Sequence, residues 1–212
     1  MVLVTTKNGK IIWLNLMIEQ EMLLIIKRFS NDKMGDDVIH GFSHVERVLN
    51  SCLYLGKKLN ANLRILEISA LLHDIGRNHE NSGIEGKNHA ELSAGMALNF
   101  LKSRDFQLSQ EEIDKIIHSI KSHSFSNNYL PNTLEAKILS DADKLDALGA
   151  IGLFRTIGFA IKKGAGIEKV IDHLERKILK LKEQMNLDIS KKLAQERHQI
   201  ILDFYNNIRN EI

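Results

Sequence analysis

The chain has 212 residues, of which 43% are hydrophobic and 26% charged, and its formal net charge is +2 with histidine neutral. This balance is typical of a globular protein with one substantial core, and it excludes a disordered or fibrous chain. The charge is too small to predict stable nucleic-acid binding, and no run of about eighteen apolar residues predicts a membrane span. With Cys52 as its single cysteine, the chain can form neither an internal disulfide nor a sulfur-rich zinc site. We therefore expect a cytoplasmic protein without a membrane partner.

The first sixteen residues differ from the rest of the chain. Two short apolar runs, Val2–Thr6 and Ile11–Leu14, flank an Asn8-Gly9 pair that is typical of a tight turn between strands. We predict that residues 1–16 form an N-terminal appendage with a short hairpin, and that residues 17–212 form one domain.

From Met17 onward the apolar residues have helical spacing almost throughout, without strand pairs or internal repeats. Ser109 and Glu112 form a capping-box pattern, and Pro131 interrupts the chain before another apolar run. The predicted fold class is all-α, a single compact helical domain with additional C-terminal helices. The expected helices span residues 17–33, 43–60, 63–75, 89–103, 109–122, 133–145, 147–163, 167–184 and 188–210.

A histidine stands at the start of the helix expected over residues 43–60. His44 lies beside the apolar stripe of Val45 and Val48 and can therefore point inward. Taken alone, such a residue is more often a hydrogen-bonded core histidine than a metal ligand.

The helix expected over residues 63–75 is apolar nearly all round and ends with His73-Asp74. Burying a carboxylate and an imidazole without partners would cost several kcal/mol, so both groups need compensation. A divalent cation provides it directly, whereas a hydrogen bond between the two side chains is the simpler alternative. Gly76 follows as a helix-ending C′ glycine, and Arg77 opens an exposed loop.

Three aspartates, Asp141, Asp143 and Asp146, fall within six residues of an otherwise apolar helix. Like charges repel and burial is costly, so a cation in a cleft would explain them, and a solvated helix face is the alternative. A helical wheel places Asp141 and Asp146 within the apolar arc and Asp143 at its edge.

The remaining candidate groups come from two further parts of the chain. His89, His118 and His123 stand at the ends of two expected helices, where spacing alone does not assign them a role. The apolar positions of the C-terminal helices are expected to close the core, with a homodimer face as the alternative; they include Ile171, Leu174, Ile178 and Leu181.

The order of His44, the His73-Asp74 pair and a later aspartate resembles the H…HD…D signature of the HD superfamily of metal-dependent phosphohydrolases. The resemblance is closest to small bacterial HD-domain nucleotide pyrophosphohydrolases, which carry HDIGR, here His73–Arg77, followed by DADKLDALGAIG, here Asp141–Gly152. It extends from about Met17 to the C-terminus.

The resemblance implies a metal site with four ligands, His44, His73, Asp74 and Asp143. Asp143 is the aspartate of the A-D-x-L-x-A segment, although the helical phase keeps Asp141 open as the alternative fourth ligand. His40 occupies another position that is often histidine in these relatives.

The resemblance also implies contacts to the substrate. Arg77 and Lys144 match residues that contact substrate phosphate, with surface cations as the alternative reading. His89 and His123 match groups that act as general acid in one-metal branches or hold a second ion in two-metal branches.

The implied reaction is hydrolysis of a (d)NTP to a (d)NMP and pyrophosphate with Mn²⁺, Mg²⁺ or Fe²⁺ as cofactor. A nucleotide phosphodiesterase or 5′-nucleotidase is the second reading. The third is a non-catalytic, regulatory metal- and nucleotide-binding module. The expected partner is a small nucleotide.

Overall fold

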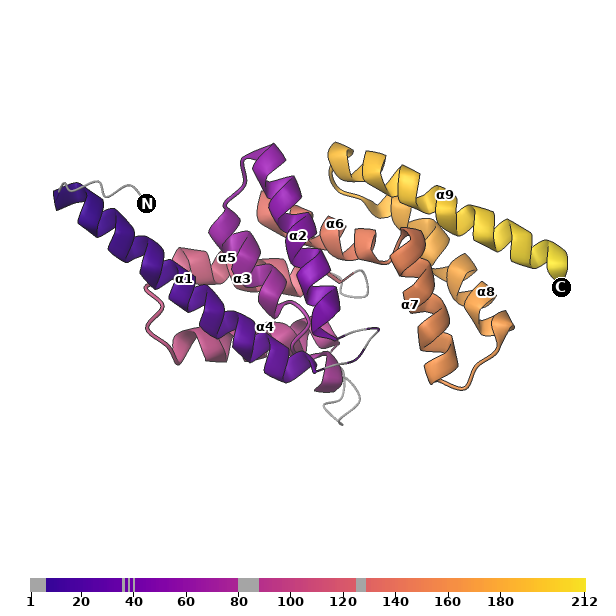
Figure 1. Cartoon of the computed structure of the whole chain (residues 1–212), viewed down its shortest axis with the longest axis horizontal. Helices are drawn as coiled ribbons and strands as arrows, with labels where there is room; N and C mark the ends of the chain where they lie inside the picture. Colours follow the sequence, from indigo (N-terminus) through magenta and orange to yellow (C-terminus); the bar gives the residue numbers. More distant parts are fainter. Residues whose placement is uncertain (1–6, 36, 38, 40, 80–87, 125–128) are drawn as a thin grey trace.

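The computed structural model describes residues 7–35, 37, 39, 41–79, 88–124 and 129–212, with side chains from Met17 onward. The described residues form helices without any strand, which confirms the all-α prediction (Figure 1). None of these helices is long and apolar enough to cross a membrane. In chain order the elements are α1 (Lys7–Met34), α2 (Phe42–Leu59), α3 (Leu63–Leu72), η1 (Arg77–His79), α4 (His89–Lys102), α5 (Gln110–Ser122), α6 (Leu134–Asp146), α7 (Gly149–Lys162), α8 (Ile167–Arg176), η2 (Ile178–Gln184) and α9 (Asp188–Glu211).

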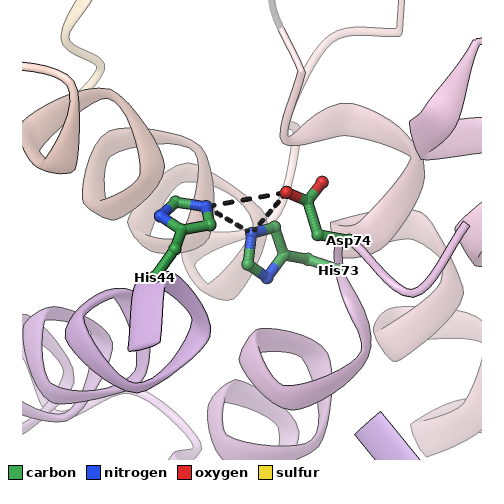
Figure 2. A group of neighbouring side chains, drawn as sticks. All are labelled: His44, His73 and Asp74. Carbon is green, nitrogen blue, oxygen red and sulfur yellow. Dashed lines mark hydrogen bonds and ion pairs between the residues drawn. The ribbon is translucent and has the colours of Figure 1, made fainter. Parts of the chain in front are cut away.

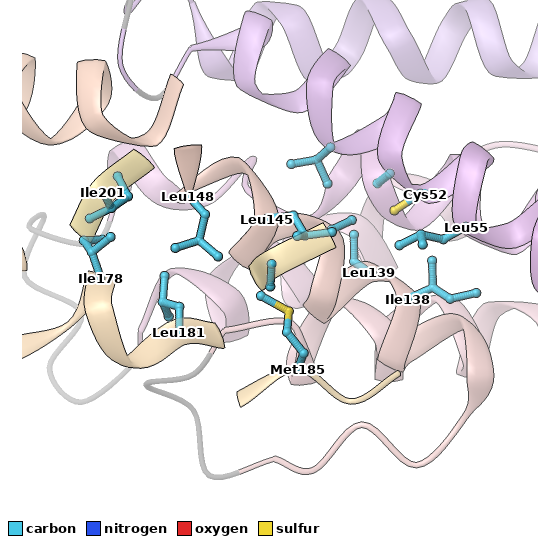
Figure 3. Close-up of a cluster of buried hydrophobic side chains, with 14 of the residues drawn as sticks. Cys52, Leu55, Ile138, Leu139, Leu145, Leu148, Ile178, Leu181, Met185 and Ile201 are labelled. Atoms are coloured by element: carbon cyan, nitrogen blue, oxygen red, sulfur yellow. The ribbon is translucent and has the colours of Figure 1, made fainter. Parts of the chain in front are cut away.

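Two clusters of buried apolar side chains hold these helices together. The first cluster contains side chains from all five helices α1 through α5, and its members include Ile26, Val45, Leu72 and Ile120. The second joins α2, α3 and α6 to the C-terminal helices, and Figure 3 shows many of its members. Burial of each fully buried aliphatic side chain stabilises the fold by roughly 1.5–3 kcal/mol. This packing fixes the helices that carry the polar groups of the site.

The apolar positions of the C-terminal helices lie in the second cluster, as expected for core residues. Ile171, Leu174, Ile178 and Leu181 are all at most 5% exposed. Helix α6 packs against α2, α3 and α5 on one side and against α7 and α9 on the other (Figure 1). It therefore joins the N-terminal and C-terminal halves of the molecule.

The hairpin predicted near the N-terminus is wrong for the residues that are described. Asn8 and Gly9 lie in the first turn of α1, and Ile11–Leu14 continues that helix, whereas Val2–Thr6 lies outside the described residues. The first N–H groups of a helix have no intrahelical partner, so a helix start tolerates poor helix formers there. The division of the chain at residue 17 stays a prediction.

Two local predictions also differ from the structure. Gly76 does not have the positive φ of a C′ glycine; it is needed because a Cβ there would lie 2.5 Å from the backbone nitrogen of Ser93 in α4. The single helix expected over residues 167–184 is broken at Lys177 and continues as the 3₁₀ helix η2. With three residues per turn, η2 keeps Ile178 and Leu181 on one buried face.

Candidate metal centre

Two imidazoles and a carboxylate converge where α2 and α3 meet (Figure 2). His44 stands in the first turn of α2, His73 caps the C-terminus of α3, and Asp74 follows it; all three are fully buried. The Nε2 atoms of the two histidines are 3.3 Å apart, and Asp74 Oδ2 lies 3.6 Å from the Nε2 of His44 and 3.8 Å from that of His73. The potential ligand atoms all lie within 4.8 Å of one another.

Hydrogen bonds at the far side of each ring fix which nitrogen faces this centre. His73 Nδ1 lies 2.8 Å from the carbonyl oxygen of Ala70, and His44 Nδ1 lies 2.7 Å from Asp146 Oδ2. A carbonyl or carboxylate oxygen accepts, so both Nδ1 atoms donate, and each neutral ring turns an Nε2 lone pair toward the other. Two facing lone pairs beside a carboxylate need a positive charge between them. The donor set therefore fits a divalent cation.

The helical wheel favoured Asp141 as the fourth ligand and the sequence motif favoured Asp143. The geometry of the site favours Asp143. Its Oδ1 lies 3.3 Å from His44 Nε2, and its side chain is 24% exposed, facing open space beside the buried histidines. Asp141 instead accepts hydrogen bonds from the backbone N–H groups of Asn186 and Leu187 at 2.8 and 3.0 Å. Asp141 therefore fastens α6 to the turn before α9. His40 lies outside the described residues.

A second group of potential ligands shares Asp74. Its Oδ1 lies 3.7 Å from His89 Nε2 and 3.6 Å from His123 Nε2. His123 Nδ1 donates to the carbonyl of Ile120 at 2.7 Å, and within the described part of the chain its buried Nε2 has no hydrogen-bond partner. An unpartnered buried nitrogen aimed at a carboxylate suits a second ion or a transferable proton. His118 lies apart from this group, where its Nε2 accepts a hydrogen bond from the N–H of Asn132.

Burial and charge set the protonation of these groups. Burial lowers the pKa of His73 to about 4, so this ring is neutral near pH 7. Burial alone would raise the pKa of Asp74, but Arg77 and His73 hold it well below its usual value. For His44, burial lowers the pKa, but hydrogen bonds to Asp143 and Asp146 outweigh it and raise the pKa.

The two predicted phosphate contacts both line the cleft beside this centre. Arg77 donates to both oxygens of Asp74, from Nε at 2.6 Å and from Nη2 at 3.0 Å. The Lys144 ammonium donates to the Ser140 hydroxyl at 2.5 Å and is only 7% exposed. Burial lowers the pKa of Lys144. Both cations are thus held by the protein at the edge of the cleft rather than spread over the surface.

Asp146 is one of the three aspartates noted in the sequence, but the sequence assigned it no individual role. Besides His44, it accepts two hydrogen bonds from Arg47, at 2.7 and 3.0 Å, and one from Arg155 of α7 at 2.6 Å. A carboxylate behind a ligand histidine fixes the tautomer and orientation of the ring. The available signal was that a buried aspartate on α6 needs cationic partners, and Arg47 lies one turn after His44.

The centre opens into a cleft of about 370 Å³, within the usual range for a small-molecule site. One part of its lining carries Arg77, His89, Asp143 and Lys144, and another part comes from α7, α8 and η2. The cleft therefore joins the ligand cluster to the C-terminal helices.

Comparisons with known proteins agree with this geometry. The HD domain family model matches residues 41–148. YpgQ of Bacillus subtilis, an uncharacterized protein, is 34% identical over 181 residues, which are 82% of this chain and 84% of YpgQ. The crystal structure of YpgQ in complex with ADP has a TM-score of 0.73 at 31% identity, over 92% of this chain and 97% of that one. An HD-superfamily hydrolase from Bacillus thuringiensis has a TM-score of 0.67 at 26% identity, over 91% of this chain and 97% of the other.

Proposed function

The chain belongs to the HD domain family and is an HD-superfamily hydrolase, and on this premise we propose that it hydrolyses (d)NTPs to (d)NMPs and pyrophosphate. The ADP complex of the Bacillus subtilis relative supports a nucleotide as the ligand of this chain too. The proposed ligands of the ion are His44, His73, Asp74 and Asp143.

One observation carries the proposal: ligand atoms with inward lone pairs converge at the end of a cleft whose walls carry cations. A divalent ion bound there would supply Lewis-acid stabilisation of phosphoryl charge and activation of water. Two nitrogen and two oxygen ligands suit Mn²⁺, Mg²⁺ or Fe²⁺, and we propose Mn²⁺ as the first to test.

The protein's own groups have separate proposed roles. Arg77 and Lys144 offset negative charge that grows on the phosphoryl oxygens, because a guanidinium and an ammonium both bind such oxygens well. His89 lines the cleft, so its Nε2 is the proposed donor of a proton to the leaving oxygen. His123 is fully buried behind it, where it orients Asp74 or holds a second ion.

The test is a product assay on protein stripped of metal and resupplied with Mn²⁺, Mg²⁺, Fe²⁺ or Zn²⁺. NTPs, dNTPs, monophosphates and cyclic nucleotides are supplied in turn, and pyrophosphate, triphosphate and orthophosphate are separated. We expect pyrophosphate from a triphosphate, and a rate reduced about 100-fold or more in His89→Gln. His118→Gln is the matched control, since His118 lies outside the cluster.

The assay separates the competing functions. Orthophosphate from a monophosphate, without pyrophosphate from any triphosphate, would replace the proposal by a 5′-nucleotidase. Opening of a cyclic nucleotide would indicate a phosphodiesterase. Metal and nucleotide binding without any product would indicate a regulatory module.

A further inference from the structure

The wall of the cleft that faces the metal centre comes from helices outside the segment matched by the family model. On α7, Arg155, Thr156 and Phe159 line the cleft, followed by Lys163 at the end of the helix. Residues 155, 159 and 163 follow at steps of four, and Thr156 lies three residues before Phe159, so neighbours at these steps share a helical face. His173 and Lys177 complete this wall from α8 and the residue that caps it.

The charge of the cleft is strongly one-sided. Among its described lining residues Asp143 is the one acidic residue, and the cationic ones are Arg77, Lys144, Arg155, Lys163 and Lys177. Three of these are already engaged, since Arg77 binds Asp74, Lys144 binds Ser140 and Arg155 binds Asp146. Lys163 and Lys177 have no carboxylate partner among the described residues and are both exposed. Lys163 and Lys177 thus add two exposed positive charges to the cleft, beside the charge of Lys144, whose partner Ser140 is neutral.

The position of these lysines suits the far end of a phosphate chain. Arg155 is bonded to Asp146, which in turn holds His44, so this part of α7 lies next to the metal centre. Lys163 follows eight residues later, about 12 Å farther along the helix at 1.5 Å per residue. Its ammonium lies 5.8 Å from the ring centroid of Phe159, and such a contact favours a side chain that lies along the cleft wall. Lys163 and Lys177 each cap a helix C-terminus, where the partial negative charge of the helix favours a protonated lysine.

We propose that Lys163 and Lys177 form a pyrophosphate subsite that binds the β- and γ-phosphates of a nucleoside triphosphate. The inference rests on the proposed function, in which the α-phosphate lies at the metal centre. Water gives a proton to the solvent as its oxygen bonds to the α-phosphorus, the bond from that phosphorus to the α–β bridging oxygen breaks, and pyrophosphate leaves with that oxygen, which takes a proton from His89. The subsite would select triphosphates over monophosphates.

The test measures binding of inorganic pyrophosphate by calorimetry at saturating Mn²⁺. The double variant Lys163→Gln/Lys177→Gln should bind pyrophosphate about 10- to 100-fold more weakly, because each contact between a charged group and phosphate is worth more than a neutral hydrogen bond. Its KM for the triphosphate should rise by a similar factor, with kcat changed much less. Lys169→Gln/Lys180→Gln is the matched control, since both lysines are exposed on the same segment and neither lines the cleft.

Pyrophosphate binding that is equal in wild type and the double variant would overturn the inference. So would an equal weakening of nucleoside monophosphate binding, which would assign this wall to the nucleoside. Binding is measured without turnover, so the two proposals can fail separately. If pyrophosphate binding depends on the lysines but no triphosphate is hydrolysed, the subsite stands and the proposed reaction falls.

Discussion

The two walls of the cleft hold their polar side chains in opposite ways. On the metal side, His44, His73 and Asp74 are completely buried, and each ring is fixed through its second nitrogen. On the C-terminal side, Lys163 and Lys177 are exposed on flexible stems at helix ends. An ion needs ligands at fixed distances, whereas a phosphate chain that arrives and leaves is better held by mobile cations. The contrast shows that the same cleft combines fixed, buried side chains on one wall with exposed, adaptable lysines on the other.

Helix α6 serves both walls through its three aspartates. Asp143 faces the cleft, Asp146 holds His44 and Arg155, and Asp141 binds the turn before α9. Substitutions of these residues, and of Asp74, should therefore separate ion binding, ligand orientation and stability.

The largest effect is expected for Asp74→Ala on the rigid wall. Asp74 belongs to both groups of potential ligands, so its loss should remove the ion and lower kcat roughly a thousandfold, the size expected when Lewis-acid stabilisation of several kcal/mol is lost. Metal content by elemental analysis and kcat are measured together, with Asp114→Ala on the exposed face of α5 as the control. Unchanged metal content and activity would refute the assignment of the centre.

A smaller effect is expected for Asp146→Asn, which leaves all four proposed ligands in place. An amide cannot accept from His44 Nδ1 and both arginines as a carboxylate does, so the ring loses its fixed tautomer. Metal affinity should fall about 10- to 100-fold, as is typical when a group behind a ligand is lost. Metal titration checks this, and an unchanged affinity would show that the ring is oriented by packing alone.

In the metal-free protein, the contribution of Asp146 to the free energy of unfolding should disappear in acid. Burial opposes ionisation of Asp146, but hydrogen bonds from His44 and Arg47 lower its pKa to about 2. A carboxyl group with a lowered folded-state pKa stabilises the protein above its unfolded pKa of about 4, and this stability is lost as the pH falls from about 4 to about 2. The contribution is about 2 kcal/mol. Unfolding by urea across this range should show the wild type approaching Asp146→Asn, and a constant difference would contradict the prediction.

The smallest effect on the metal centre is expected for Asp141→Ala. Asp141 is buried on α6 like Asp146, but it contacts the turn before α9 and not a proposed ligand. Its removal leaves the N–H groups of Asn186 and Leu187 without their acceptor and should lower the free energy of unfolding by about 2 kcal/mol. Metal affinity should stay unchanged, because Asp141 does not face the ligands. A loss of metal as large as in Asp143→Ala would instead return Asp141 to the ligand set.

The sequence predicted the helices well because their apolar spacing is regular, and the specific motif order predicted that His44, His73 and Asp74 lie together. It also placed Asp141 and Asp146 correctly in the apolar arc of α6. Burial was a poor guide to ligation, however, because buried aspartates can be satisfied by protein donors that come from distant parts of the chain. Arg155 and Asn186 are such donors, and their approach depends on tertiary packing that no local pattern encodes. The N-terminal hairpin was wrong because a two-residue turn signal was weaker than the helix that follows it.

The contact of Arg155 with Asp146 would make binding of an ion at the proposed site and docking of α7 depend on each other. Arg155 also donates to the carbonyl of Ile39 at 2.9 Å, so it ties α7 to the segment just before α2 as well as to α6. A ligand that binds one conformation more tightly stabilises that conformation. An ion that binds more tightly when Asp146 orients His44 would therefore also stabilise the position of α7 in which Arg155 contacts Asp146. Loading the centre should protect the amides of α7 from hydrogen exchange, and the wall that receives the substrate would then be fully assembled only in the metal-bound protein.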